Sequence, residues 1–393
     1  MKHFPILLLA LVAAACSQKA PEALEAFNPA DGIVFSDMSA DKMAHCSIFK
    51  VVGDEVYFAY YHDTTQTIEH PKMPTIMPVL ARSPWPVTGE GIEYTDVVRC
   101  GETYGGFTQD STRAPYDPNL LLVGDRLRFY FNGCMDGDVV YTARTFDVKK
   151  KEFEPEAVPC RIVFEGDTLT MTSHNLFAIM DRLGYETADI NDVVISHRFI
   201  KYRGSWYNVV ANGFTPASKP LVIKTGDGLV FDFVSACGEV PGGTCEAAFE
   251  FKGDEMYLIT RNIFRDGSLN ATYISKFSMK DGSCLATPRA LTPQTAKSAL
   301  IRKGRHVYAL YNVLPDIEKD GVSVGRSRLR LARLNSDCTL ADSVDITGGF
   351  GIHYPYTDIV DGEVWMTFSE DRRGLSPPGY TRSNLSLIKL PLR

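Results

Sequence analysis

The most regular feature of the chain is a hairpin pattern, clearest between residues 245 and 261. An alternating stretch that includes Glu246 runs into Gly253-Asp254, and a β-rich stretch leads out to Arg261. Glycine supplies the positive φ that a two-residue turn needs, and alternation of apolar and polar residues is typical of a strand with one buried face. The pattern predicts an antiparallel hairpin in which Glu246 faces Arg261 at the open end.

The same hairpin can be aligned six times along the chain. One repeated antiparallel unit predicts an all-β fold, a six-bladed β-propeller of four-stranded antiparallel blades, because radial closure leaves few open sheet edges. Two stacked β-sandwiches are the alternative, but they do not explain a repeated hairpin. The turns are expected at Gly53-Asp54, Gly124-Asp125, Gly204-Ser205, Gly253-Asp254, Gly304-Arg305 and Asp361-Gly362.

Three stretches interrupt the repeat, at residues 64–78, 158–195 and 316–325. We expect them to form rim loops and one extra strand pair. Loops on the rim of a rigid scaffold often carry function.

Polar or reactive residues recur seven positions before each turn. Equivalent residues of six blades converge on one central mouth, so these positions are predicted to ring it. Counting eight positions forward from each turn gives their cross-strand partners, among them Tyr61, Asn132, Arg261 and Ser369. A solvated channel without further role is one interpretation, but the mixture of chemical groups favours a binding pocket. The six positions are Cys46, Asp117, His197, Glu246, Lys297 and Tyr354.

The first residues resemble an export signal that ends on a cysteine. A short basic start precedes an apolar run (residues 6–12), and small residues lead to Cys16. This arrangement resembles the lipobox of bacterial lipoproteins, in which Cys16 is acylated after cleavage; plain secretion is the alternative. We therefore expect a signal peptide (residues 1–15), a tether (16–30) and a single propeller domain (31–393), anchored by its lipid in a bacterial cell envelope.

The composition and net charge of the chain limit the classes of binding partner to expect. The chain has 393 residues and a net charge of −7 without a basic run, so nothing favours nucleic acid or an anionic membrane surface. A small molecule or glycan is the expected partner of a monomer, with membrane contact only through the N-terminal lipid. No zinc-type spacing of cysteines or histidines occurs, and neither a metal nor a cofactor is expected.

Eight further cysteines follow Cys16. An even number in an exported chain favours disulfides. Their placement in the repeats and along the chain suggests three pairs: Cys284 with Cys338, Cys100 with Cys160, and Cys237 with Cys245.

Several segments resemble, in order, the motifs of the sialidase (neuraminidase) superfamily of six-bladed propellers. Arg113-Ala-Pro-Tyr resembles the Phe/Tyr-Arg-Ile-Pro motif, whose Arg holds the substrate carboxylate, and the segment around Asp136 resembles the one that carries the acid/base Asp. The opening hairpin and the segment at His353 and Tyr354 resemble those bearing the Glu base, the second Arg and the Tyr nucleophile. Three features depart from the family: the first Arg motif falls in the second blade, no Asp box is intact, and Lys297 stands where a third Arg is expected.

The resemblance implies an exported, retaining exo-glycosidase that acts on an acidic sugar at a glycan end. It implies Tyr354 as nucleophile, Glu246 as the base that takes its proton and Asp136 as acid/base. A neutral nucleophile avoids repulsion by the sugar carboxylate, and sialidases use Tyr in this role. The resemblance implies that Arg113, Arg261 and Lys297 bind the sugar carboxylate, and Arg372 could substitute for a missing member. The further substrate-binding candidates at the mouth are Asp117, His197 and His353, of which Asp117 could instead cap a strand and His197 could be structural.

Each of these residues also has a structural interpretation. Glu246 and Arg261 could form only a cross-strand ion pair, and Asp136 could be an ordinary turn residue. Tyr354 could be a packed aromatic residue, and Tyr356 is a rival for its role.

Two other functions fit the same residues. One is a glycan-binding propeller without turnover. The other is a polysaccharide lyase acting on uronic acids, with His197, His353 or Tyr354 as base and acid and Lys297 neutralising the carboxylate.

Overall fold

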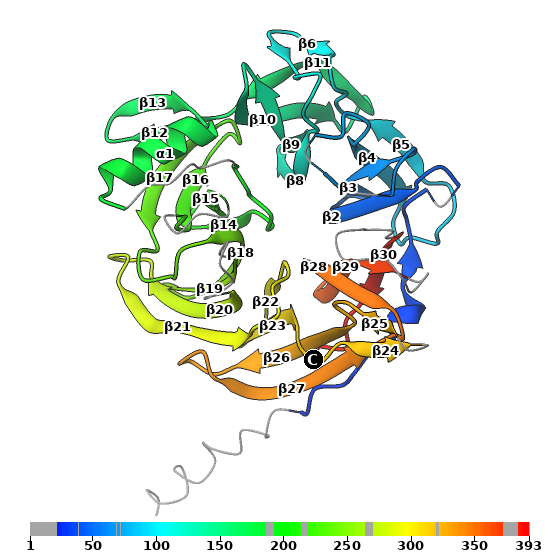
Figure 1. The fold of residues 1–393 in the computed structure, drawn as a ribbon, viewed down its shortest axis with the longest axis vertical. Helices are drawn as coiled ribbons and strands as arrows, with labels where there is room; N and C mark the ends of the chain where they lie inside the picture. Colours follow the sequence, from blue (N-terminus) through cyan, green and yellow to red (C-terminus); the bar gives the residue numbers. More distant parts are fainter. Residues whose placement is uncertain are drawn as a thin grey trace, which may run out of the picture.

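The computed structural model is a ring of six antiparallel sheets around a central mouth (Figure 1). The all-β, six-bladed propeller predicted from the repeat is therefore confirmed. The structure describes residues 22–37, 39–67, 69–70, 72–185, 192–211, 213, 218–263, 270–319, 322–371 and 384–392.

Each blade begins with the strand nearest the mouth and is built outward by antiparallel neighbours. Blade 1 consists of β2 (Met43–Val52), β3 (Glu55–Asp63), β4 (Met77–Pro84) and β5 (Glu93–Asp96). Blade 2 consists of β8 (Tyr116–Val123), β9 (Arg126–Met135), β10 (Asp138–Asp147) and β11 (Glu152–Pro159). Blade 3 consists of β14 (Ile200–Tyr202), β15 (Ser205–Val210), β16 (Leu221–Thr225) and β17 (Val230–Ala236).

The second half of the ring follows the same plan. Blade 4 consists of β18 (Thr244–Lys252), β19 (Glu255–Asn262), β20 (Ala271–Ser278) and β21 (Cys284–Thr292). Blade 5 consists of β22 (Ala299–Lys303), β23 (His306–Asn312), β26 (Arg328–Leu334) and β27 (Leu340–Thr347). Blade 6 consists of β28 (Gly351–Val360), β29 (Glu363–Asp371), β30 (Asn384–Lys389) and β1 (Ile33–Val34).

The ring closes by joining the two ends of the domain. Strand β1 pairs antiparallel with β30, with Ile33 opposite Leu387, so the start of the domain supplies the outer strand of the last blade. This pairing covers a sheet edge that would otherwise stay open. Upstream of it, Leu24 and Phe27 pack against the hydrophobic cluster of blades 5 and 6, so this part of the predicted tether lies on the propeller.

The interruptions of the repeat contain more structure than the sequence indicates. The longest carries the expected strand pair, β12 (Arg161–Phe164) and β13 (Asp167–Thr170), which extends blade 3, but also a helix, α1 (Ser173–Arg182). Helix α1 begins where the Thr172 side chain accepts a hydrogen bond from the Asn175 amide. The smaller elements are η1 (Pro29–Asp31) and the hairpins β6 (Thr103–Tyr104) with β7 (Phe107–Thr108) and β24 (Ile317–Lys319) with β25 (Val322–Val324).

Five of the six predicted turns lie where expected, and the third is shifted by one residue. The turn of blade 3 is Arg203-Gly204, not Gly204-Ser205, because Tyr202 pairs with Ser205 as the first rung of the hairpin. Both turn residues take positive φ, 47° and 90°. Two-residue hairpin turns of this type need positive φ at both positions.

The eight cysteines that the structure describes are all free thiols, so none of the three suggested disulfides is formed. Equivalent positions in consecutive repeats lie on separate sheets, which is why Cys284 of blade 4 does not meet Cys338 of blade 5. Within the described ranges no helix is long and apolar enough to cross a membrane.

A largely buried ion network ties five of the six blades together. The Arg198 guanidinium pairs with Glu250 on β18 and, at 3.3 Å, with Asp358 on β28, and Lys50 on β2 lies 2.9 Å from the same Asp358. The Glu250 carboxylate also accepts the Arg302 backbone N–H of blade 5 at 2.9 Å. Removal of one partner from such a network leaves a buried charge without compensation.

We therefore expect Glu250→Gln to lower the free energy of unfolding by about 3 kcal/mol, measured by urea denaturation. The matched control is Glu363→Gln, since Glu363 forms ion pairs with Lys303 and Lys389 at the surface, where a pair contributes less than about 1 kcal/mol. Equal losses in the two variants would contradict this account of the network.

Candidate active site

Three of the predicted site residues meet at the mouth through one guanidinium nitrogen. Nη1 of Arg261 donates to the Tyr354 hydroxyl at 2.7 Å and to Oε2 of Glu246 at 2.6 Å. Tyr354 and Glu246 are largely buried, with 8% and 7% of their surfaces exposed. The predicted pairing of Glu246 with Arg261 across β18 and β19 is confirmed. Blades 4 and 6 therefore supply a phenol, a carboxylate and a guanidinium to one cluster.

The first strands of blades 1, 2 and 6 each contain a β-bulge at the mouth. The residues at the bulges, Cys46, Asp117 and Tyr354, have φ values of 56°, 51° and 57°. A left-handed backbone at a bulky residue is uncommon, and the surrounding structure must hold it. Bulges of this kind often redirect a side chain beside an active site.

The bulges also correct the cross-strand partners predicted by counting from the turns. Each bulge adds one residue to the first strand. The partner predicted for the residue at the bulge therefore pairs with the residue just before it. His45 pairs with Tyr61, Tyr116 with Asn132, and His353 with Ser369.

The Tyr354 hydroxyl is protonated in the resting site. Burial raises the pKa of Tyr354 well above the ordinary value of a phenol; Arg261 and Arg326 oppose the shift and Glu246 adds to it. A buried phenol of this kind reacts as a nucleophile only if a nearby group takes its proton.

Arg326 is a second arginine at Tyr354 that the sequence analysis missed. It lies between β25 and β26, and its guanidinium carbon is 5.5 Å from the centre of the Tyr354 ring. One of its nitrogens donates to the Thr295 carbonyl at 3.3 Å. Its place in the sequence could have revealed it, because Arg326 directly follows the interruption of the repeat at residues 316–325.

Glu69 is a second missed residue and comes from the interruption in blade 1. Its Oε1 accepts from the Tyr61 hydroxyl at 2.5 Å, and 32% of its side chain remains accessible. Burial raises the pKa of Glu69; the charge of Glu246 adds to this shift, while Tyr61, Arg261 and Arg326 oppose it. Glu69 is therefore a carboxyl group that keeps its proton to higher pH than usual, close to the charges around Tyr354.

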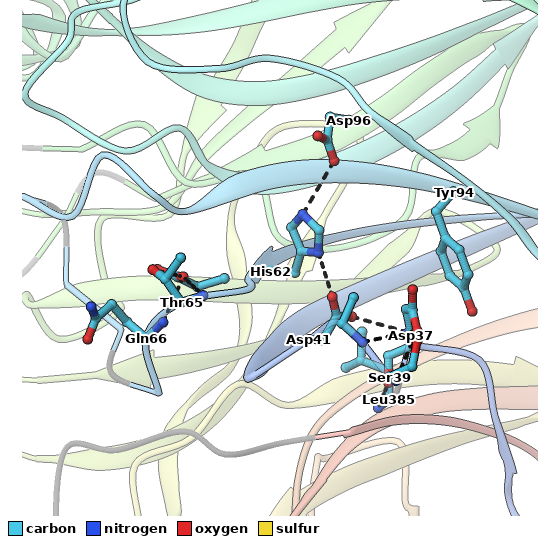
Figure 2. A network of polar contacts seen from close by, with 12 residues as sticks. Asp37, Ser39, Asp41, His62, Thr65, Gln66, Tyr94, Asp96 and Leu385 are labelled. Atoms are coloured by element: carbon cyan, nitrogen blue, oxygen red, sulfur yellow. Dashed lines mark hydrogen bonds and ion pairs between the residues drawn. The ribbon is translucent and has the colours of Figure 1, made fainter.

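The base of the Glu69 loop is fixed by a polar network at the end of β3. The Asp63 carboxylate caps the loop by accepting the backbone N–H groups of Thr65 and Gln66 at 2.7 and 2.9 Å. The neighbouring His62 bridges two carboxylates, with Nδ1 2.6 Å from Asp41 and Nε2 3.3 Å from Asp96 (Figure 2). Burial opposes the charge of His62, but the two carboxylates raise its pKa to about 9.

This pKa predicts a stability that depends on pH. Below about pH 6.5 the imidazole is charged in the folded and unfolded chains, and its stabilising effect is fully present; the effect is lost as the pH rises through about 9. We expect His62→Gln to lower the free energy of unfolding by about 2 kcal/mol at pH 7 and by little at pH 10, measured by urea denaturation.

The control is His174→Gln on the exposed surface of α1, which is expected to change the free energy of unfolding by less than about 0.5 kcal/mol at either pH. A loss of equal size at pH 7 and pH 10 in His62→Gln would exclude the charged imidazole as its cause.

Two neutral histidines lie beside the Tyr354 ring. The ring of His45 is 4.2 Å from it and that of His353 is 5.7 Å, centre to centre. Burial lowers the pKa of His45 far below its usual value and that of His353 to about 3, and neighbouring cations add to both shifts. The predicted residue His353 thus adjoins the cluster as an uncharged ring.

A second polar group occupies the side of the mouth formed by blade 2. The Asn132 amide donates to Asp117 at 3.0 Å and to Asp192 at 3.4 Å. Burial and the repulsion between the carboxylates raise the pKa of Asp117, and burial raises that of Asp192 to about 6 against the effect of Arg113. Lys297, 4% exposed, lowers the pKa of Asp117, so this lysine acts on Asp117 as well as on His45.

Asp136 and Arg113 belong to the second blade, where Arg113 precedes β8 and Asp136 directly follows β9. Asp136 is exposed in the turn between β9 and β10, with φ 54°. It borders a cavity of about 720 Å³ whose other lining residues are Met135 and part of the 101–112 segment. Arg113 is half-buried, and its backbone carbonyl accepts the Gln109 side-chain amide at 2.7 Å.

The remaining predicted residues divide into buried and undescribed ones. His197 is 1% exposed, and its carbonyl accepts the side-chain amides of Asn119 and Asn208, both at 2.8 Å, which joins blades 2 and 3. Arg372 and Cys16 lie outside the described residues. In the described part of the chain no three histidine, cysteine or acidic residues are placed to hold a metal ion.

Comparison with solved structures identifies the architecture. Trypanosoma rangeli sialidase in complex with sialic acid superposes with a TM-score of 0.55 over 92% of this chain, at 10% identity. The fold is that of the sialidases. The subtype N10 neuraminidase-like protein of a little yellow-shouldered bat isolate gives a TM-score of 0.51 at 9% identity, covering 92% of this chain and 98% of its own.

The likeness to sialidases is one of fold. The chain spans 57% of the length of the trypanosomal sialidase. No family model matches the chain, and no curated protein matches it in sequence. The chemistry around Tyr354 rests on residues of the first blade and the last three: Glu69 and His45, Glu246 and Arg261, Arg326, and Tyr354 itself.

Proposed function

We propose that the protein is a retaining glycoside hydrolase of sialidase type that acts on an acidic sugar at the end of a glycan. The observation that carries the proposal is the Arg261 guanidinium, which contacts both the Tyr354 hydroxyl and Glu246. Arg261 stands between the phenol and the carboxylate, so it would stabilise the phenolate that develops as Tyr354 attacks, and Glu246, bound to the same guanidinium nitrogen, would accept the proton.

The remaining groups complete this chemistry. Arg261 and Arg326 both lie beside the Tyr354 ring and would hold the sugar carboxylate, with Lys297 as a further cation in the mouth. Asp117, Asp192 and Asn132 would bind hydroxyl groups on the opposite side of the sugar. His197 supports the blades beneath the site, and His353 packs beside the nucleophile.

We assign the acid/base role to Glu69 in place of Asp136. Its raised pKa favours the protonated form that an acid needs, and a third of its side chain is accessible. In the first step Tyr354 forms a bond to the anomeric carbon while Glu69 protonates the departing oxygen. In the second step Glu69 takes a proton from water, which attacks the same carbon and releases Tyr354.

The test incubates the protein with a 4-methylumbelliferyl sialoside and, separately, with a matching glucuronide. Proton NMR monitors the products over time and reports the anomeric configuration of the released sugar. Release of the sugar with its anomeric configuration retained supports the proposal. An unsaturated product would instead support a lyase, and binding of either sugar without turnover would support a glycan-binding propeller.

Export and attachment through Cys16 to a bacterial envelope remain part of the proposal, tested by metabolic labelling with a fatty acid in wild type and Cys16→Ala.

A further inference from the structure

His45 joins the proposed acid/base residue to the last blade. Its side chain is 1% exposed on β2. One ring nitrogen, Nδ1, lies 2.9 Å from the Ser369 hydroxyl on β29, and the other, Nε2, lies 3.9 Å from Oε2 of Glu69. The imidazole therefore stands between a hydroxyl from blade 6 and a carboxyl group from the rim loop of blade 1.

The surroundings favour one tautomer of this ring. Ser369 can donate its hydroxyl proton to Nδ1, which leaves the ring proton on Nε2, facing Glu69. When Glu69 is ionised, the opposite tautomer would place a lone pair of the ring toward a carboxylate lone pair. The tautomer with Nε2–H toward Glu69 is therefore the one that matches both neighbours once Glu69 has given up its proton.

We infer that His45 is a positioning residue for Glu69, an uncharged N–H donor that orients the acid/base carboxyl group without removing its proton. The inference rests on the proposed function for the role of Glu69. Tyr61 holds Oε1 of the same carboxyl group, so the two donors together would fix both oxygens. When Glu69 has given up its proton, the His45 N–H can close the 3.9 Å gap and stabilise the carboxylate.

An uncharged donor matters because the site already contains several charges. The groups that act on Glu69 are Tyr61, Glu246, Arg261 and Arg326, and two of these four are cations that lower the pKa of Glu69. A further cation at position 45 would lower it again, by about one unit or more at this separation. Burial and the neighbouring cations keep His45 neutral, which preserves the raised pKa of the proton donor.

The test compares a neutral and a charged replacement of His45. His45→Gln keeps an N–H donor of similar reach, and we expect kcat/KM within about fivefold of wild type. The pH at which the rate falls as Glu69 ionises should be the same as in wild type. His45→Arg is expected to move that fall to lower pH by about one unit or more. His45→Lys supplies the charge if the arginine variant does not fold.

A second pair of variants separates positioning from packing. Ser369→Ala removes the group that selects the tautomer, and we expect kcat to fall about tenfold with KM little changed. Ser386→Ala on β30 is the matched control, since Ser386 is equally buried and its hydroxyl has no hydrogen-bond partner among the residues that the structure describes. Equal effects of the two substitutions would overturn the tautomer argument.

A direct titration distinguishes this inference from the proposed function. The Glu69 carboxyl carbon, assigned with Glu69→Gln, can be followed by carbon-13 NMR in protein that has no substrate. A titration midpoint above the ordinary value in wild type and His45→Gln, and at least about one unit lower in His45→Arg, supports the inference whether or not the protein turns over a sialoside. Equal midpoints in all three proteins would overturn it even if the protein proves to be a glycosidase.

Discussion

Tyr354→Phe is expected to lower kcat on an acidic ketoside at least about a thousandfold, because the variant has no oxygen to attack the anomeric carbon. Substrate affinity should change little, since Arg261 and Arg326 remain to bind the carboxylate. Initial rates with a fluorogenic substrate and equilibrium binding of an unreactive sugar acid separate the two effects.

Tyr356→Phe provides the matched control. Tyr356 lies two residues further along β28, is 2% exposed, and packs 5.7 Å from Phe49 in the core shared by blades 6, 1 and 2. Loss of its hydroxyl should leave kcat within about threefold of wild type. If Tyr356→Phe were the inactive variant, the assignment of the nucleophile would be wrong.

Glu69→Gln is expected to lower kcat/KM about 100- to 10,000-fold on a natural glycan, whose leaving oxygen needs a proton. An aryl leaving group departs without full protonation, so the loss on an aryl substrate should be much smaller. Because the pKa of Glu69 is raised, the wild-type rate should persist to a higher pH than an ordinary glutamate would allow and fall as this carboxyl group ionises; the fall should vanish in the variant.

Asp136→Asn is the control for this assignment, since Asp136 is the residue that the family resemblance favours. We expect its rate to stay within about threefold of wild type on both substrates. The reverse result, a large loss of rate in Asp136→Asn and a small loss in Glu69→Gln, would show that Asp136 is the acid/base residue.

The fold was predictable because its cause is local and repeated. Each hairpin carries its own turn signal and its own alternation of apolar and polar residues. Six such units leave few unpaired strand edges when they close into a ring. The pairing of Glu246 with Arg261 followed from one turn by counting alone.

Counting failed where the backbone departs from regular pairing. Nothing in the sequence around Cys46 or Tyr354 signals a left-handed residue, yet each bulge shifts the register by one and brings His45 and His353 opposite the predicted partners. Helix α1 was missed because its apolar residues stand within a stretch interpreted as loop.

The two missed site residues, Glu69 and Arg326, belong to or directly follow interruptions of the repeat. A repeat-based alignment has no equivalent for such residues, so it cannot place them at the mouth. Glu69 reaches the mouth because Asp63 caps its loop and Tyr61 holds its carboxyl group, contacts that only the folded chain contains.

The most direct test of the central claim is to trap the bond between Tyr354 and the sugar. Incubation with 2,3-difluorosialic acid or 2,3-difluoro-KDN would release fluoride from the anomeric carbon as the phenol oxygen attacks. Mass spectrometry of the digested protein is expected to find one monofluorinated sugar on the peptide that contains Tyr354, and none in Tyr354→Phe. A sugar attached to another residue, or no adduct with either reagent in a preparation that hydrolyses the sialoside, would contradict the account.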